Sequence, residues 1–263
     1  MDLGIAGNSA VVAASSSGLG KASAAALAEE GANVVINGRD SERLSDAADD
    51  LRESATGEVV AHPGDLTDPD DVEGLIDRAV QEFGGLDHLV TNAGGPPSGP
   101  FLETTDEDWE TAYELLVMSA VRLCRAAADP LRAAGGGTIV AITSHSVKEA
   151  IDDLVLSNSV RMGVVGLEKT LSREFAPAVR ANVVMPGTHA TDRMEYLIQR
   201  SVDAGDFDSW EESLAHWTHG IPLERMGDPD RFGQVVAFLS SEPASYINGE
   251  AVMVDGGDAR SNL

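Results

Sequence analysis

Short runs of apolar and β-branched residues alternate along the whole chain with longer stretches whose apolar residues recur at helical spacing. Such short runs are typical of buried strands, and the longer periodic stretches are typical of helices. The predicted strands are Ala10–Ala13, Asn33–Ile36, Glu58–Ala61, His88–Thr91, Thr138–Ile142, Ala181–Val184 and Ala251–Val254. The clearest helical pattern places apolar side chains at Leu156, Val160, Val164, Leu167, Leu171 and Phe175.

Strands separated by crossover helices predict an α/β fold in which a doubly wound, seven-stranded parallel sheet carries helices on both faces. Ligands of such sheets bind at the carboxyl ends of the strands. No linker or repeat divides the chain, so residues 1–263 are predicted to form a single domain. One irregular insertion, Arg193–Gly220, is rich in acids and contains Trp210 and Trp217. Its place after the sixth strand predicts a lid over the substrate.

The composition is that of an ordinary globular domain, with 263 residues of which 43% are apolar and 24% charged. No stretch reaches the roughly 18–20 apolar residues of a membrane span, and the first residues lack the bases of a secretory signal. We therefore expect a cytoplasmic protein without a membrane partner. Cys124 is the single cysteine, which excludes an intrachain disulfide and a cysteine-built metal site, and we assign no metal site.

Acidic residues dominate the charge, with 44 Asp and Glu against 18 Lys and Arg and a net charge of −26. Nucleic acid is an unsuitable partner, because binding phosphates requires a basic surface. Lysine is scarce, and the three present are Lys21, Lys148 and Lys169. An acidic surface is tolerated where concentrated salt screens its self-repulsion, so the composition favours a halophilic protein over a merely acidic mesophilic one.

A glycine-containing turn joins the first predicted strand to a helical stretch, Lys21–Glu30. Small residues there let the backbone approach a pyrophosphate, and the N–H groups at a helix start favour its charge. A tight turn without a nucleotide would also use glycine. The turn consists of Ala14, Ser15, Ser16, Ser17, Gly18, Leu19 and Gly20.

The second strand is followed by Arg39, where a dinucleotide fold faces the adenosine ribose. An arginine suits the 2′-phosphate of NADP, whereas an acid would accept from the free hydroxyl of NAD. Arg39 therefore favours NADP over NAD, unless it is a solvated loop residue.

Motifs along nearly the whole chain resemble the short-chain dehydrogenase/reductase family. They are the glycine turn, Gly64-Asp65-Leu66-Thr67-Asp68, Asn92-Ala93-Gly94, Ile142-Thr143-Ser144, Asn182–Gly187 with Thr191, Arg225–Pro229, Phe238–Ser241 and Asp255–Gly257. The resemblance implies a Rossmann-like domain in which Asp65 and Leu66 contact adenine and Asn92, Ala93 and Gly94 form the cofactor floor. It also implies that Pro186, Gly187, Thr188 and Thr191 hold the nicotinamide end. Ala14 replaces the family's first glycine, which we expect to be tolerated if its φ is negative.

The resemblance further implies hydride exchange between the nicotinamide and a carbonyl or alcohol carbon. The family uses a serine, a tyrosine, a lysine and an asparagine for this chemistry. Ser144 matches the serine, but Ser157, Arg161 and Leu116 stand at the other three positions. A phenol, with a pKa of about 10, can be adjusted towards neutrality, whereas the hydroxyl of Ser157 is far too weak an acid.

Other residues could replace the lost functions. Arg161 stays protonated, and its planar donors suit ribose hydroxyls or a substrate carboxylate. His145, Lys148 and His189 follow predicted strands and are candidate proton donors, although each could equally be a loop side chain in water.

We therefore expect an NADP-dependent oxidoreductase acting on a small carbonyl or alcohol, such as a 3-oxoacyl compound, a sugar or a ketone. A nucleotide-binding or scaffold protein without redox turnover is the first alternative. A cofactor-independent lyase resembling halohydrin dehalogenases, which pair serine and tyrosine with arginine, is the second. Family members commonly assemble through helices matching Trp109–Ala128 and Leu154–Ala176, so a homotetramer or homodimer is expected.

Overall fold

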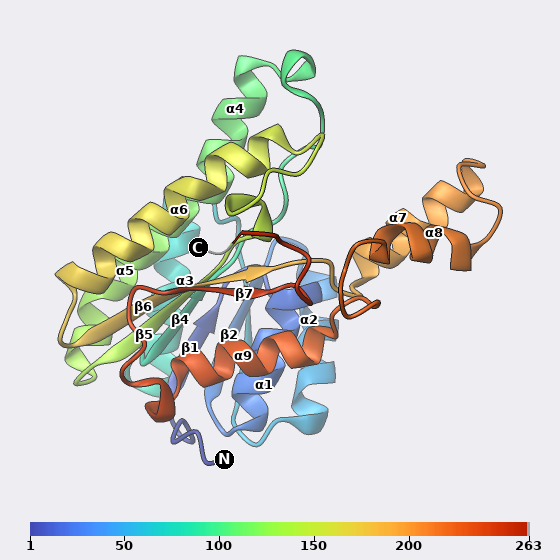
Figure 1. Ribbon diagram of the computed structural model, residues 1–263. Helices are drawn as coiled ribbons and strands as arrows, with labels where there is room; N and C mark the ends of the chain where they lie inside the picture. The colour runs from blue at the N-terminus through green and yellow to red at the C-terminus, as the bar shows by residue number, and fades with distance from the viewer. Residues whose placement is uncertain (262–263) are drawn as a thin grey trace.

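The computed structural model describes residues 1–261 and places one seven-stranded parallel sheet in this part of the chain, with strand order β3-β2-β1-β4-β5-β6-β7 (Figure 1). This confirms the predicted α/β class. The strands are β1 (Ser9–Val12), β2 (Asn33–Gly38), β3 (Val59–Pro63), β4 (His88–Thr91), β5 (Gly137–Ile142), β6 (Val179–Pro186) and β7 (Ala251–Val254).

Each strand lies within a few residues of its predicted position, and β6 departs most because it is longer at both ends. Pairing with two neighbours extends it, since Val179 is opposite Gly137 of β5 and Pro186 is opposite Val254 of β7. The polar Arg180 interrupts the apolar run, yet its guanidinium donates to the carbonyl oxygens of Leu239, Ser241 and Ile247. Backbone pairing, rather than local hydrophobicity, sets the ends of this strand.

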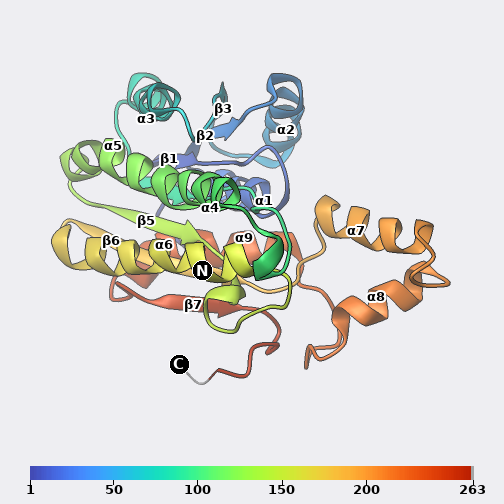
Figure 2. The same cartoon turned by 90° about the horizontal axis from the view of Figure 1, so that it is seen from above.

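Helices cover both faces of the sheet, and alternate strand residues pack against opposite layers (Figures 1 and 2). Ala10 and Val12 of β1 belong to the cluster with α1, α2 and α9, whereas Val11 belongs to the cluster with α3, α5 and α6. The flanking helices are α1 (Gly18–Glu29), α2 (Ser41–Ser54), α3 (Pro69–Phe83), α4 (Asp106–Tyr113), α5 (Ser119–Ala133), α6 (Val155–Glu174) and α9 (Pro229–Ser240).

A π-helical turn, Glu114–Met118, joins α4 to α5 and contains Leu116. The Leu116 side chain is buried in a hydrophobic cluster with Val160 and Val164 of α6. An apolar residue therefore fills the site where the family resemblance places an asparagine.

The segment expected to be irregular, Arg193–Gly220, is mostly helical, and this expectation was wrong. It forms most of α7 (Asp192–Asp203) and all of α8 (Trp210–Thr218), which project from the body of the domain (Figures 1 and 2). The two helices contact each other through the hydroxyls of Ser201 and Ser213, 2.7 Å apart. The helices expose most of their surface, so the core-facing apolar stripe that normally reveals a helix is short here.

The strand order reverses beside β1, because β2 and β3 lie on one side of it and β4 to β7 on the other. Loops leaving β1 and β4 at this point separate and leave a crevice at the carboxyl ends of the strands. Among residues 1–261, no helix is long and apolar enough to cross a bilayer.

Candidate active site

A large crevice of about 980 Å³ lies at the carboxyl ends of the strands. All residues that the sequence analysis assigned to the cofactor line it, from the β1–α1 turn through the ends of β2, β3 and β4 to the segment after β6. They are Ala14, Ser16, Ser17, Gly18, Leu19, Gly20, Arg39, Asp65, Leu66, Asn92, Ala93, Gly94, Arg161, Pro186, Gly187, Thr188 and Thr191.

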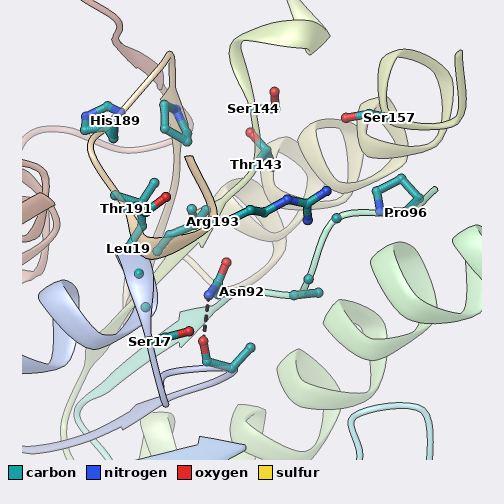
Figure 3. A pocket seen from close by; sticks show the side chains of 18 of the residues that line it. Ser17, Leu19, Asn92, Pro96, Thr143, Ser144, Ser157, His189, Thr191 and Arg193 are labelled. Atoms are coloured by element: carbon teal, nitrogen blue, oxygen red, sulfur yellow. Dashed lines mark hydrogen bonds between the residues drawn. The ribbon is translucent and has the colours of Figure 1, made fainter. Parts of the chain in front are cut away.

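The turn between β1 and α1 is tightly packed (Figure 3). A Cβ on Gly20 would lie 2.4 Å from the carbonyl oxygen of Ala14 and 2.7 Å from Nδ2 of Asn92. Asn92 Nδ2 also donates to the Ala14 oxygen at 3.0 Å, which joins the loops after β1 and β4. Ala14 has φ +46°, so the negative φ that we expected is wrong. The turn keeps the left-handed geometry of a glycine although its residue is alanine, at a cost in backbone strain.

Asn37 at the end of β2 joins the loops at the β2–β3 end of the crevice, and sequence reasoning missed this role. Its Oδ1 accepts from Ala14 N at 3.3 Å, and its Nδ2 donates to the carbonyl oxygens of His62 and Gly64. Asn37 is buried and therefore positions the three loops after β1, β2 and β3. Its apolar neighbours in the strand gave no signal of this.

Two exposed arginines, Arg39 and Arg43, line the same end of the crevice. The acid closest in sequence, Asp40, caps α2 and accepts from the backbone N–H groups of Glu42 and Arg43. Asp40 is thus already engaged with the backbone of its own helix.

Asp65 lies in the loop after β3 and lines the same end of the crevice. Its Oδ1 accepts from the backbone N–H of Thr67 at 2.9 Å. That N–H chiefly lowers the pKa of Asp65, although partial burial opposes this effect. Asp65 is therefore held as a carboxylate beside the loop.

Three serine side chains lie at the opposite end of the crevice, beyond β5. Ser144 Oγ accepts from the backbone N–H of Ser146 at 3.1 Å, and the hydroxyls of Ser146 and Ser157 are 3.1 Å apart. Ser157 is buried, and Figure 3 shows that its hydroxyl and that of Ser144 lie on the same side of the crevice.

Arg161 lies one turn after Ser157 on α6, with only 8% of its surface exposed. Its Nη2 donates to the carbonyl oxygen of Gly94 at 3.4 Å, while its Nε has no partner among the described residues. Burial, followed by repulsion from Arg193, lowers the pKa of Arg161 to about 10. The group therefore remains a buried cation at neutral pH.

The two candidate histidines line the crevice in different environments. His145 Nδ1 lies 3.1 Å from the carbonyl oxygen of Pro186, and its Nε2 lies 4.0 Å from Asp258 Oδ2. His189 Nδ1 lies 3.0 Å from the carbonyl oxygen of Gly187, and its ring packs edge-on against Phe232. Burial lowers the pKa of His189, so its ring is neutral at pH 7. Asp258, in the final segment of the chain, carried no signal of a role in the sequence.

Lys148, the remaining candidate acid, is exposed and does not line the crevice. It follows the short helical turn His145–Val147, which separates it from the loop that holds Ser144. Lys148 therefore does not share the crevice with Ser144, although only three residues separate the two in the sequence.

The fold and crevice define the class of a nucleotide-binding, doubly wound α/β protein. A family profile described as enoyl-(acyl carrier protein) reductase matches residues 13–258. A human protein named dehydrogenase/reductase SDR family member 4 is 33% identical over 258 residues, which cover 96% of this chain and 88% of that protein. The chain belongs to the short-chain dehydrogenase/reductase family.

Solved structures with the same fold include reductases crystallised with a cofactor. L-sorbose reductase from Gluconobacter frateurii, complexed with NADPH and L-sorbose, has a TM-score of 0.95 and 33% identity, covering 99% of this chain and 100% of that one. A variant of the actinorhodin polyketide ketoreductase with NADPH has a TM-score of 0.89 and 28% identity, covering 97% of this chain and 98% of that one.

Proposed function

We propose that this protein is an NADP-dependent oxidoreductase that exchanges a hydride with a small carbonyl or alcohol substrate. The observation that carries the proposal is one continuous crevice with a close-packed glycine turn and exposed arginines at one end and a polarising serine at the other. Two structural relatives are reductases complexed with NADPH, which supports the same cofactor here.

The residues present fit NADP. The start of α1 suits a pyrophosphate, because its N-cap residue Ser17 makes no side-chain capping bond and free N–H groups at a helix start attract phosphate. Arg39 and Arg43 suit the 2′-phosphate, whereas Asp40, the acid next to Arg39 in the sequence, is already occupied in capping α2. NAD, which needs an acceptor at this position, is the less suitable cofactor.

The nicotinamide end would lie between Asn92–Gly94 and the segment from Pro186 to Thr191. NADPH, when bound there, supplies the hydride. Arg161, beside Gly94, has planar donors that suit hydroxyls of the neighbouring ribose or a carboxylate of the substrate. These roles follow the family resemblance and the crevice lining together.

Reduction of a carbonyl also requires an oxygen binder and a proton. Ser144 would donate a hydrogen bond to the carbonyl oxygen and so polarise it. Ser157, at the position expected for tyrosine, is hydrogen-bonded to Ser146 and is too weak an acid to replace a phenol. His145 would supply the proton, because its ring lines the crevice and its Nε2 lies 4.0 Å from the Asp258 carboxylate.

The projecting helices α7 and α8 would form the substrate lid. Met194, Tyr196 and Trp217 of this segment line the crevice. Their apolar surface would exclude water from the substrate when the helices approach it.

The proposal is tested by titrating the protein with NADPH and NADH in molar salt, followed by turnover assays with aldehydes, ketones, sugars and oxoacyl compounds. We expect preferential NADPH binding, and turnover that falls about 10²- to 10³-fold in Ser144→Ala. Ser240→Ala, a buried serine outside the crevice, is the control. NADPH binding without turnover would instead support the non-redox alternative, which the absence of a phenol at position 157 favours. Preference for NADH would contradict the role of Arg39.

A further inference from the structure

Two guanidinium groups converge in the substrate half of the crevice. Arg161 enters it from α6, and Arg193 enters it from the first turn of α7. Nη1 of Arg193 lies 2.9 Å from the point that a Cβ on Gly95 would occupy, and Arg161 bonds to the carbonyl oxygen of the adjacent Gly94. Figure 3 shows the Arg193 side chain extending across the crevice towards Ser157 and Pro96.

Neither cation is neutralised by the part of the chain that the structure describes. Arg161 and Arg193 have no carboxylate within ion-pair distance there, although acids outnumber bases 44 to 18 in the sequence. In contrast, Arg52, Arg78 and Arg122 each pair with an acid. A buried, unpaired cation is unfavourable, and a second cation beside it makes the site more so.

An anionic ligand would relieve both penalties. The buried Nε of Arg161 offers a donor for which the described residues supply no acceptor. A planar guanidinium binds a carboxylate through two parallel hydrogen bonds, and the two groups together suit one carboxylate better than a neutral ribose or amide.

We propose that Arg161 and Arg193 bind the carboxylate of the substrate, so that the protein acts on aldehydes or ketones that carry a carboxylate close to the reacting carbonyl. This inference rests on the proposed function. Ser144 would donate to the carbonyl oxygen while the two arginines bind the carboxylate. These contacts together would fix the orientation of the bound substrate. Arg193 belongs to the proposed lid, so binding of the anion would also draw α7 towards the crevice.

Matched pairs of acid and neutral amide test this proposal. The probes are pyruvate with pyruvamide and 3-oxobutanoate with 3-oxobutanamide, titrated calorimetrically with and without saturating NADPH and then assayed for turnover. We expect each acid to bind about 10- to 100-fold more tightly than its amide, because hydrogen bonds to charged groups are the stronger ones. The pairs differ in charge but little in shape, so the ratio isolates the carboxylate.

Substitutions then assign the preference to these residues. Arg161→Gln and Arg193→Gln should each reduce the ratio of acid to amide affinity about tenfold. Arg193→Gln concerns an exposed side chain and remains informative if the buried substitution fails to fold. Arg231→Gln, an exposed arginine on α9 that does not line the crevice, is the control for charge.

The outcomes separate this inference from the proposed function. Equal affinity for acids and amides, no measurable binding of the acids, or a preference that survives both arginine substitutions would overturn it. Failure to bind NADPH would reject the proposed cofactor, whereas the titrations without NADPH would still report on the carboxylate site.

Discussion

The two halves of the crevice are built differently. At the nucleotide half, backbone and amide hydrogen bonds from Asn37 and Asn92 join the loops, and little space separates them. At the substrate half, several serines, His145 beside Asp258 and two arginines without an acidic partner in residues 1–261 lie around an open volume near the projecting helices. The first half is closely packed, and the second holds uncompensated charge.

The two halves of the crevice therefore differ in how much residue substitution they tolerate. The turn after β1 keeps the left-handed backbone of a glycine at Ala14, with φ +46°, although alanine stands there. The substrate half needs only suitable donors near the reacting carbon, and side chains from several loops can supply them. Substitutions confined to one half should therefore leave the binding at the other half intact.

The largest effect is expected from Gly20→Val, which would place side-chain atoms against the Ala14 carbonyl and the Asn92 amide. We expect loss of measurable NADPH binding in a calorimetric titration, because backbone atoms cannot move aside as a flexible side chain can. Gly166→Ala, whose Cβ would meet no atom within 4 Å, should bind NADPH normally. Wild-type affinity in Gly20→Val would show that the turn does not hold the cofactor.

His145→Asn should reduce kcat/KM for carbonyl reduction about 10²-fold or more, with NADPH affinity unchanged, since it removes the proposed proton donor. His62→Asn, on β3 outside the crevice, is the control. His189→Asn should have a smaller effect, because burial keeps that ring neutral. A larger loss in His189→Asn than in His145→Asn would reverse the assignment.

Arg39→Glu should weaken NADPH binding about 10- to 100-fold and leave NADH binding equal or stronger, because it replaces a partner of the 2′-phosphate with a like charge. The two dissociation constants measure this directly. Arg231→Glu introduces the same charge on α9 away from the crevice and should leave the ratio of the constants unchanged. If Arg39→Glu leaves the ratio of the NADPH and NADH dissociation constants unchanged, Arg43 rather than Arg39 binds the 2′-phosphate.

No effect on ligand binding is expected from Glu168, a buried residue of α6 that faces Cys124 of α5 outside both halves of the crevice. Its Oε1 lies 3.7 Å from Cys124 Sγ, its Oε2 has no partner among the described residues, and burial raises its pKa to about 8. Glu168 therefore keeps its proton in the folded state up to about pH 8, whereas in the unfolded chain it loses the proton near the ordinary carboxyl pKa. The free energy of unfolding should fall as the pH rises towards 8.

Glu168→Gln removes this titration, and we expect the fall in unfolding free energy between pH 5 and pH 9 to shrink by about 1–3 kcal/mol. Urea unfolding across this range measures the effect. Glu174→Gln, an exposed acid at the end of the same helix, should retain the wild-type slope. NADPH affinity should be unchanged in both variants, and identical slopes in wild type and Glu168→Gln would refute the account.

Much of the fold followed from local pattern, because the spacing of apolar residues reports directly on strands and helices. His88–Thr91 and Ala251–Val254 have the same bounds in the prediction and in the structure. The two helices within residues 193–220 were not predicted, because they bury few side chains in the core and so lack a long apolar stripe. The predicted cofactor residues all line one crevice, since the loops after parallel strands meet at one edge of a sheet.

The α/β class and the family could be predicted from the chain alone, because periodicity and motif order are local properties of a sequence. Folding determines which side chains come together: it leaves Lys148 outside the crevice, brings Asp258 within 4.0 Å of His145 and places Arg161 and Arg193 in the same crevice. These contacts join residues from different loops. Their geometry depends on how the packed sheet directs each loop, which no single stretch of sequence encodes.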